Sequence, residues 1–256
     1  MTAVEVHTVV TGREDGPVVV LSNSLGSTYK MWDAQLAALE ERLRVVRYDI
    51  RGHGYSPVPD GPYSIDDLAD DLVALLDQLG IGRAHLVGLS LGGMTAMRVA
   101  ARNPDRVDRL ALLCTGAALP PASGWTDRAA TVRAGGSAAV AKAVVERWFT
   151  PGHLAAHPDV REAHEAMVAA TPAEGYAGCC EAIAALDLRD DLASIKAPTL
   201  AIAGADDPAT PPAKLEEIAA GVPHARLLVV PRAAHLANAE QPAIITPALI
   251  AHLEQS

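Results

Sequence analysis

The chain has 256 residues, of which 50% are hydrophobic and 20% charged, enough for one large domain with or without an insertion. Its formal net charge of −10 argues against a nucleic-acid or anionic-membrane partner, because both attract basic proteins. No apolar run reaches the ~18 residues that span a bilayer, and the opening MTAVEVHTVVTG does not resemble a signal peptide. Cys114, Cys179 and Cys180 lack metal-ligand spacing, so we expect reduced thiols in a cytoplasmic protein.

Short runs of β-forming residues recur along the chain. All but the first are nearly continuous in apolar residues, which is typical of parallel strands covered on both faces of a sheet. The predicted strands are 4–10, 17–22, 44–49, 84–89, 109–114, 198–204 and 225–231.

Helical periodicity fills several of the gaps between these strands. The clearest helices are predicted over 64–80, with Ser64 as N-cap and Gly80 as its stop, and over 90–104. Alternation of strands and helices predicts a doubly wound, mostly parallel α/β sheet.

The alternation breaks over residues 118–196. This segment has no convincing strand, and its alanine-rich pieces 135–149 and 160–170 have helical patterns. We therefore expect a helical cap inserted over the carboxyl edge of a core made of residues 1–117 and 197–256.

Gly88-Leu89-Ser90-Leu91-Gly92 matches the G-x-S-x-G nucleophile elbow. It follows a predicted strand and opens a predicted helix, where the turn strains the serine and helix–strand packing excludes flanking side chains. The alternative is that Ser90 is only a helix cap.

A serine nucleophile requires a base. His235 is the strongest of the nine histidines, because it follows the last predicted strand and would lie at the carboxyl edge. The histidine needs a carboxylate in turn. Asp206 and Asp207 follow the strand at 198–204, in the Ser…Asp…His order of α/β-hydrolases. A simple acidic turn is the alternative for this pair.

The whole chain resembles the α/β-hydrolases, including the DIRGHGYS stretch at 49–56. More narrowly, it resembles the 3-oxoadipate enol-lactonases of aromatic catabolism. This narrower resemblance is carried by SNSLGSTYKMWDAQ (22–35), GLSLGGMTA (88–96), RWFTP (147–151) and AGADDPATPP (203–212).

The resemblance implies specific roles. The family acid falls on Asp207, and Asn23-Ser24 stands where many superfamily members have His-Gly, as in the enol-lactonases. The backbone N–H groups of Leu25 and Leu91 would then form the oxyanion hole.

The implied reaction is hydrolysis of a small anionic lactone through an acyl-enzyme in the β-ketoadipate pathway, with no metal or organic cofactor needed. A broad carboxylesterase or perhydrolase, or a carbon–carbon bond hydrolase, could use the same three residues. A haloalkane dehalogenase would need an aspartate at Ser90. A ligand receptor of the same fold is the non-enzyme alternative, although a pure binder would not need all three groups.

The substrate carboxylate needs a partner if it is buried. Residues 125–158 hold an excess of basic over acidic side chains: Arg128, Arg133, Lys142 and Arg147 against Asp127 and Glu146. We predict that Arg133, before a glycine pair, receives the carboxylate and that Trp148 forms an apolar wall. The alternative is that these arginines are solvated residues of helix faces.

Overall fold

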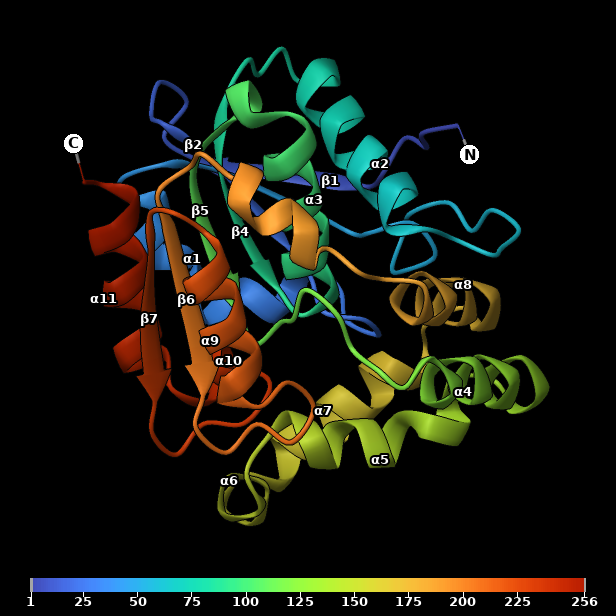
Figure 1. Ribbon diagram of the computed structural model, residues 1–256. Helices are drawn as coiled ribbons and strands as arrows, with labels where there is room; N and C mark the ends of the chain where they lie inside the picture. The colour runs from blue at the N-terminus through green and yellow to red at the C-terminus, as the bar shows by residue number, and fades with distance from the viewer. Residues whose placement is uncertain (1, 256) are drawn as a thin grey trace.

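The computed structural model describes residues 2–255. Its centre is a seven-stranded sheet in the order β1-β3-β2-β4-β5-β6-β7, in which only β1 is antiparallel to its neighbour. The strands, visible in Figure 1, are β1 (Thr8–Gly12), β2 (Val18–Ser22), β3 (Arg44–Tyr48), β4 (Ala84–Leu89), β5 (Val107–Leu113), β6 (Thr199–Gly204) and β7 (Ala225–Val230).

The strand predictions are confirmed, with two differences at the edges. The first strand begins at Thr8 and not at Val4, because it pairs only with β3, from Thr8 opposite Tyr48 to Gly12 opposite Arg44. The last strand is not covered on both faces as expected: Leu227 and Val229 of β7 are exposed. By contrast, β4 and β6 are buried along their whole length, as central parallel strands should be.

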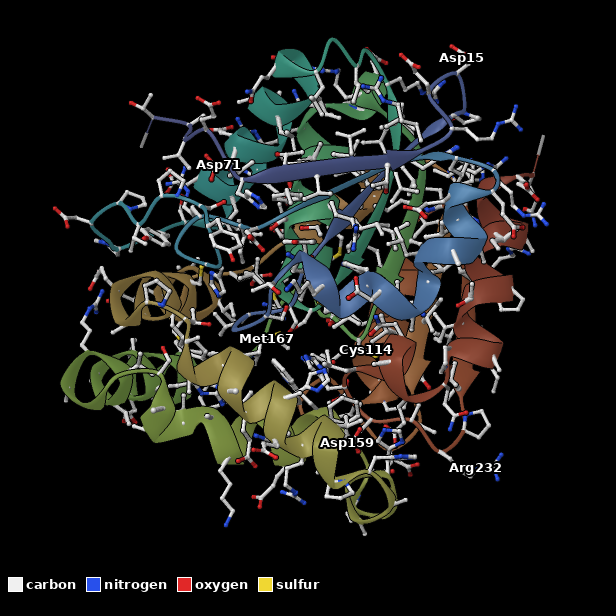
Figure 2. All side chains as sticks on the ribbon, turned by 180° about the vertical axis from the view of Figure 1, so that it is seen from behind. Asp15, Asp71, Cys114, Asp159, Met167 and Arg232 are labelled. Carbon is white, nitrogen blue, oxygen red and sulfur yellow. The ribbon has the colours of Figure 1, made fainter. Side chains whose placement is uncertain are left out.

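Helices cover both faces of the sheet. Figure 2 shows α1 and α11 together on one face; α10 packs beside both. The other face carries α2, α3, α9 and the short η3. Their bounds are α1 (Asp33–Glu40), α2 (Ile65–Gln78), α3 (Leu91–Arg102), α9 (Pro212–Gly221), α10 (Ala237–Glu240), α11 (Pro242–Leu253) and η3 (Arg189–Ser194), with η1 (Tyr29–Trp32) and η2 (Pro104–Arg106) in connections.

The predicted ends of α2 are confirmed in atomic detail. The Ser64 hydroxyl accepts a hydrogen bond from the Asp67 N–H at 3.2 Å, and the Asp67 carboxylate accepts one from the Ser64 N–H at 2.8 Å. These two reciprocal hydrogen bonds satisfy two N–H groups that the start of a helix otherwise leaves without a partner. Gly80 ends the segment with φ +66°.

The segment between β5 and β6 is helical and lies over the carboxyl ends of the strands (Figure 1). Its helices are α4 (Ala122–Gly135), α5 (Ala138–Trp148), α6 (Pro151–Ala156), α7 (Pro158–Ala169) and α8 (Ala173–Ala184). The last part of the predicted insertion, η3, packs instead against α3 and α9 of the core. Within residues 2–255, no helix is long and apolar enough to cross a membrane.

Candidate active site

Ser90 occupies a strained turn between β4 and α3. Its φ of 56° and ψ of −117° lie in a region that side-chain-bearing residues rarely adopt. Two hydrogen bonds fix the backbone of the turn: the Ser90 N–H donates to Leu113 O at 2.9 Å, and the Thr115 hydroxyl donates to Ser90 O at 2.7 Å. Ser90 stands at the N-cap position, but its side chain makes no capping hydrogen bond. A capping role therefore does not explain this serine.

The flanking glycines are required by close backbone contact. A Cβ on Gly88 would lie 2.2 Å from the carbonyl oxygen of Gly92, and a Cβ on Gly92 would lie 2.2 Å from the carbonyl oxygen of Ser22. Any side chain at either position would push α3 away from the strands. The G-x-S-x-G pattern thus reflects the space available at this turn.

Asp207 and His235 come together at the carboxyl edge. Asp207 Oδ2 lies 2.8 Å from His235 Nδ1 and also accepts a hydrogen bond from the Thr210 hydroxyl at 2.6 Å. Asp207 Oδ1 accepts from the N–H groups of Ala209 at 2.8 Å and Thr210 at 3.0 Å. The neighbouring Asp206 is exposed.

These contacts set the charge of the pair. Burial raises the pKa of Asp207, but its electrostatic interaction with His235 and the hydrogen bonds from His235 and Thr210 outweigh this effect, so the net shift is downward. An ionised Asp207 accepts a hydrogen bond from the Nδ1–H of His235, which leaves Nε2 as an acceptor.

Thr210 was not identified from the sequence. The available signal was a hydroxyl three residues after an aspartate in a turn.

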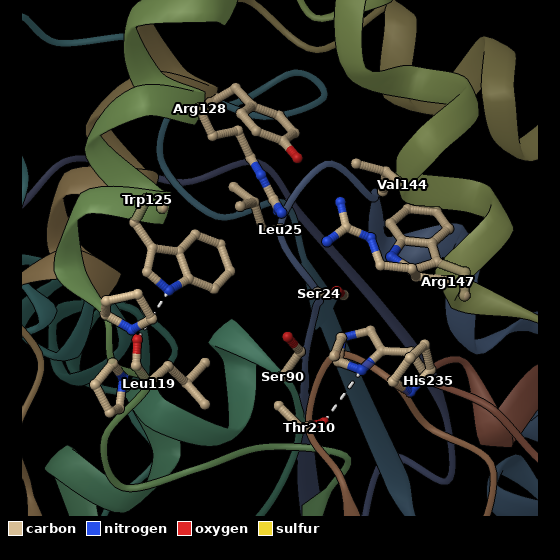
Figure 3. Close-up of a pocket in the computed structure, with 17 residues that line it drawn as sticks. Ser24, Leu25, Ser90, Leu119, Trp125, Arg128, Val144, Arg147, Thr210 and His235 are labelled. Carbon is tan, nitrogen blue, oxygen red and sulfur yellow. Dashed lines mark hydrogen bonds between the residues drawn. The ribbon is translucent and has the colours of Figure 1, made fainter.

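Ser90 and His235 line the same cavity of about 370 Å³, between the sheet edge and the cap. Figure 3 shows both side chains pointing into it, with Thr210 below the His235 ring. Ser90 is 7% exposed and His235 4% exposed. A small ligand in the cavity would reach a hydroxyl and an imidazole that are largely shielded from bulk water.

The proposed oxyanion donors come from two segments next to the cavity. Leu25 lines the cavity and Leu91 opens α3. The N–H groups that follow each of them are used: Gly26 donates to His53 Nε2 at 2.9 Å and Gly92 to Asn23 O at 2.9 Å. Within residues 2–255 the Leu25 N–H has no acceptor, and the first N–H of a helix such as α3 has no partner inside that helix.

The structure corrects the prediction for Arg133. Its guanidinium is exposed and bonded to Glu174 at 2.8 Å and to Glu181 at 2.6 Å, both on α8, and Arg133 does not line the cavity. Arg128 and Arg147 line the cavity instead, and Figure 3 shows both guanidinium groups directed into it. Trp148 also lines the cavity, at the predicted wall position.

Comparison with known proteins agrees with this architecture. A family model for the alpha/beta hydrolase fold matches residues 17–242. The 3-oxoadipate enol-lactonase 2 of Acinetobacter baylyi is 41% identical over 231 residues, or 90% of this chain and 86% of that protein. The crystal structure of the enol-lactonase from Burkholderia xenovorans LB400 has a TM-score of 0.96 at 41% identity, covering 98% of this chain and 96% of that one.

A thermophilic esterase from Thermogutta terrifontis, solved with malate bound, is a further structural relative. It has a TM-score of 0.91 at 32% identity and covers 97% of this chain and 92% of that one. The chain therefore belongs to the alpha/beta hydrolase family, as an ester hydrolase whose relatives include 3-oxoadipate enol-lactonases.

Proposed function

We propose that this enzyme hydrolyses 3-oxoadipate enol-lactone to 3-oxoadipate in the β-ketoadipate pathway of aromatic catabolism. Ser90 is the nucleophile, His235 the general base and acid, and Asp207 the group that orients His235. The similarity to enol-lactonases over nine-tenths of the chain supports this assignment. The proposal includes a cytoplasmic setting, which fits the free thiols of Cys114, Cys179 and Cys180.

In the first half-reaction, Ser90 Oγ attacks the lactone carbonyl while His235 Nε2 takes the hydroxyl proton. The backbone N–H groups of Leu25 and Leu91 stabilise the oxyanion. Collapse breaks the ring C–O bond, and the leaving enol oxygen receives the proton from His235. The enol then tautomerises to the ketone. An enol is a better leaving group than a simple alcohol, so this step needs little acid assistance.

In the second half-reaction, water attacks the acyl group on Ser90 as His235 Nε2 accepts its proton. The second tetrahedral intermediate collapses, Ser90 recovers the proton and the carboxylate product leaves. Asp207 keeps the Nδ1 proton on His235 and stabilises the imidazolium in both halves. The hydrogen bonds from Thr210 hold the carboxylate in the required orientation.

The charge of the cavity is the observation that carries the substrate assignment. Arg128 and Arg147 line it, no aspartate or glutamate does, and neither arginine forms an ion pair with a carboxylate within residues 2–255. Arg128 lies over the Trp125 ring at 4.6 Å, and burial, followed by the charge of Arg128, lowers the pKa of Arg147. An anionic ligand would relieve this repulsion, as the free carboxylate of the lactone would.

An esterase acting on carboxylate-bearing esters is the second candidate. The Thermogutta terrifontis esterase was solved with malate bound, and malate is a small dicarboxylate that would suit a cavity lined by two arginines. This candidate shares the nucleophile, the base and the anionic substrate, and differs in the leaving group.

Turnover assays separate these candidates. We expect the wild type to prefer the enol-lactone over a neutral aryl ester in kcat/KM, and both Ser90→Ala and His235→Ala to lose about 10⁴-fold or more with an unchanged circular dichroism spectrum. Near-normal activity of Ser90→Ala would overturn the mechanism. Turnover of open-chain monoesters without turnover of the lactone would favour the second candidate.

A further inference from the structure

The hydroxyl group of Tyr176 is buried in the cavity wall without a hydrogen-bond partner. Tyr176 lies on α8, is 0% exposed and lines the same cavity as Ser90 and His235. Among the described residues, 2–255, its oxygen has neither donor nor acceptor within hydrogen-bond geometry. Buried hydroxyl groups are normally paired, because an unpaired one loses its hydrogen bonds to water and gains nothing in return.

Packing fixes the position of this side chain. The ring lies against the loop that carries Leu25: a Cβ on Gly26 would stand 2.9 Å from Tyr176 Cε2. Gly26 has a φ of +81° and its N–H is bonded to His53. The ring is held between the loop at Gly26 and the backbone of α8. The hydroxyl therefore cannot move to reach a protein partner.

The surroundings of the hydroxyl are cationic. Burial raises the pKa of Tyr176, while the positive charges of Arg128 and Arg147 act in the opposite direction without cancelling it. An interaction with the Arg128 side chain also lowers the pKa of Tyr176, but the two groups do not meet at the distance and angle of a proper hydrogen bond. Arg128 can act only as a donor toward the phenol oxygen, so this contact leaves the phenol proton free. The phenol therefore stays protonated at neutral pH and retains a proton to donate, beside two guanidinium groups that offer only donors.

We propose that the Tyr176 hydroxyl is a specificity determinant that donates a hydrogen bond to the carboxylate of an anionic substrate between Arg128 and Arg147. A carboxylate supplies an acceptor for the phenol, which no protein group among residues 2–255 provides, and negative charge for the two cations. This inference rests on the proposed function, since it assigns the non-reacting carboxylate of that substrate. It implies that the enzyme prefers small lactones or esters with a carboxylate over neutral ones of equal size.

The test is Tyr176→Phe, which removes one oxygen and leaves the ring packing intact. We expect the ratio of kcat/KM for the enol-lactone to kcat/KM for a neutral aryl ester to fall about 10-fold or more, the size expected for a hydrogen bond to a charged group. The inhibition constant of adipate against aryl-ester hydrolysis should rise by a similar factor, whereas adipamide, its uncharged analogue, should bind both proteins equally weakly. The variant should unfold at the same temperature as the wild type or higher, because the lost hydroxyl had no partner.

The matched control is Tyr63→Phe. Tyr63 packs against Gly178 of the same helix, but its hydroxyl donates to Pro59 O at 2.6 Å and does not line the cavity. This variant should lose thermal stability and keep both the activity ratio and the adipate inhibition of the wild type.

The outcomes separate the inference from the proposed function. If the wild type does not hydrolyse the lactone but adipate inhibits ester hydrolysis, the lactonase assignment fails, and Tyr176 is judged on inhibition alone. Equal inhibition of wild type and Tyr176→Phe would overturn the inference, as would absence of adipate inhibition in the wild type. A large drop in the unfolding temperature of Tyr176→Phe would also count against it, because it would reveal a partner for the hydroxyl within the free protein.

Discussion

Two adjacent aspartates follow β6, and they lie in different environments. Asp207 is 3% exposed and accepts hydrogen bonds from His235, Thr210 and Ala209. Asp206 is exposed and does not line the cavity, and its backbone N–H donates to Ala233 O at 2.9 Å. A shift of one residue along the chain thus decides between an orienting group and a solvated surface charge.

We therefore expect Asp207→Asn to reduce kcat by about 10⁴-fold, because an amide can donate to Nδ1 and so favours the wrong tautomer of His235. Asp206→Asn is the matched control and should stay within about twofold of the wild type. The measurement is steady-state turnover of an aryl ester at neutral pH. The reverse ranking of the two variants would move the orienting role to Asp206.

The residues that sequence reasoning found are those whose local pattern determines their position. Ser90 and Asp207 follow strands in short motifs, so their place at the sheet edge follows from the chain itself. The prediction that Arg133 receives the carboxylate was wrong because of helix geometry. Five residues along a helix correspond to a rotation of about 500°, so the Arg133 side chain leaves the helix about 140° away from that of Arg128. Which face of α4 meets the cavity depends on how α4 packs against α8, and sequence periodicity in this alanine-rich helix does not reveal it.

At the scale of elements, the strands of the sheet and the helical character of the inserted segment were predictable, whereas the contacts between the cap and the core were not. Buried parallel strands are recognisable in the sequence as apolar runs between turn residues. For six of the seven strands, both predicted ends lie within two residues of the observed ones. The cap helices were recognisable as helices, but their contacts with the core involve single polar groups far apart in sequence. One such contact joins the cap to the loop that carries His235.

Glu240 makes this contact. It is buried on α10 and accepts hydrogen bonds from the N–H of Ala234 at 2.8 Å and from the N–H of Thr150 at 3.1 Å, with a further bond from the Thr150 hydroxyl. Thr150 stands between α5 and α6 of the cap, and Ala234 precedes His235. The same two segments are joined again where the Leu236 N–H donates to Trp148 O at 2.8 Å. The carboxylate therefore holds the cap and the histidine loop in one geometry.

We expect Glu240→Gln to lower kcat for both lactone and aryl ester by about 10- to 100-fold, because a small displacement of His235 is costly for catalysis. An amide has only one acceptor oxygen, so one of the donors at Thr150 or Ala234 loses its partner, with a loss of about 1–3 kcal/mol in the free energy of unfolding. Kinetics and urea unfolding of the same preparation measure both effects.

Two variants frame this result. Glu146→Gln changes an exposed carboxylate of α5 whose contact is with Arg161 at 3.8 Å, and it should behave as the wild type. Thr150→Ala removes the hydroxyl bond to Glu240 and the N-cap that the same hydroxyl gives to the His153 N–H of α6. It leaves the Glu240 carboxylate in place and should have a smaller effect on kcat than Glu240→Gln. A stability loss in Glu240→Gln with unchanged kcat would mean that Glu240 supports the fold without positioning His235.

At the scale of the whole molecule, two buried histidines make the fold sensitive to acid. His53 is fully buried beneath the loop that carries Leu25, and burial lowers its pKa from 6.5 to about 4 despite its bond to Arg51 O. His252 of α11 bonds to Leu110 O of β5 at 3.0 Å, and burial likewise lowers its pKa to about 4. Both rings are neutral in the folded protein at pH 6, where an unfolded chain would already bind protons.

The sign of the effect follows from proton uptake. Between about pH 6.5 and 4 the unfolded chain binds more protons than the folded one, so the free energy of unfolding falls as the pH falls through this range. For His53 the fall in pKa from 6.5 to about 4 corresponds to at most about 3 kcal/mol of unfolding free energy, and His252 adds in the same direction.

Urea unfolding at pH 7, 6, 5 and 4 should show this loss in the wild type. His252→Gln keeps a donor for Leu110 O but takes up no proton, so its stability should fall less steeply, and the exposed His224→Gln should follow the wild type. If the free energy of unfolding of wild type and His252→Gln fell equally with pH, protonation of His252 would not destabilise the fold. The acid sensitivity would then come from other groups in the core.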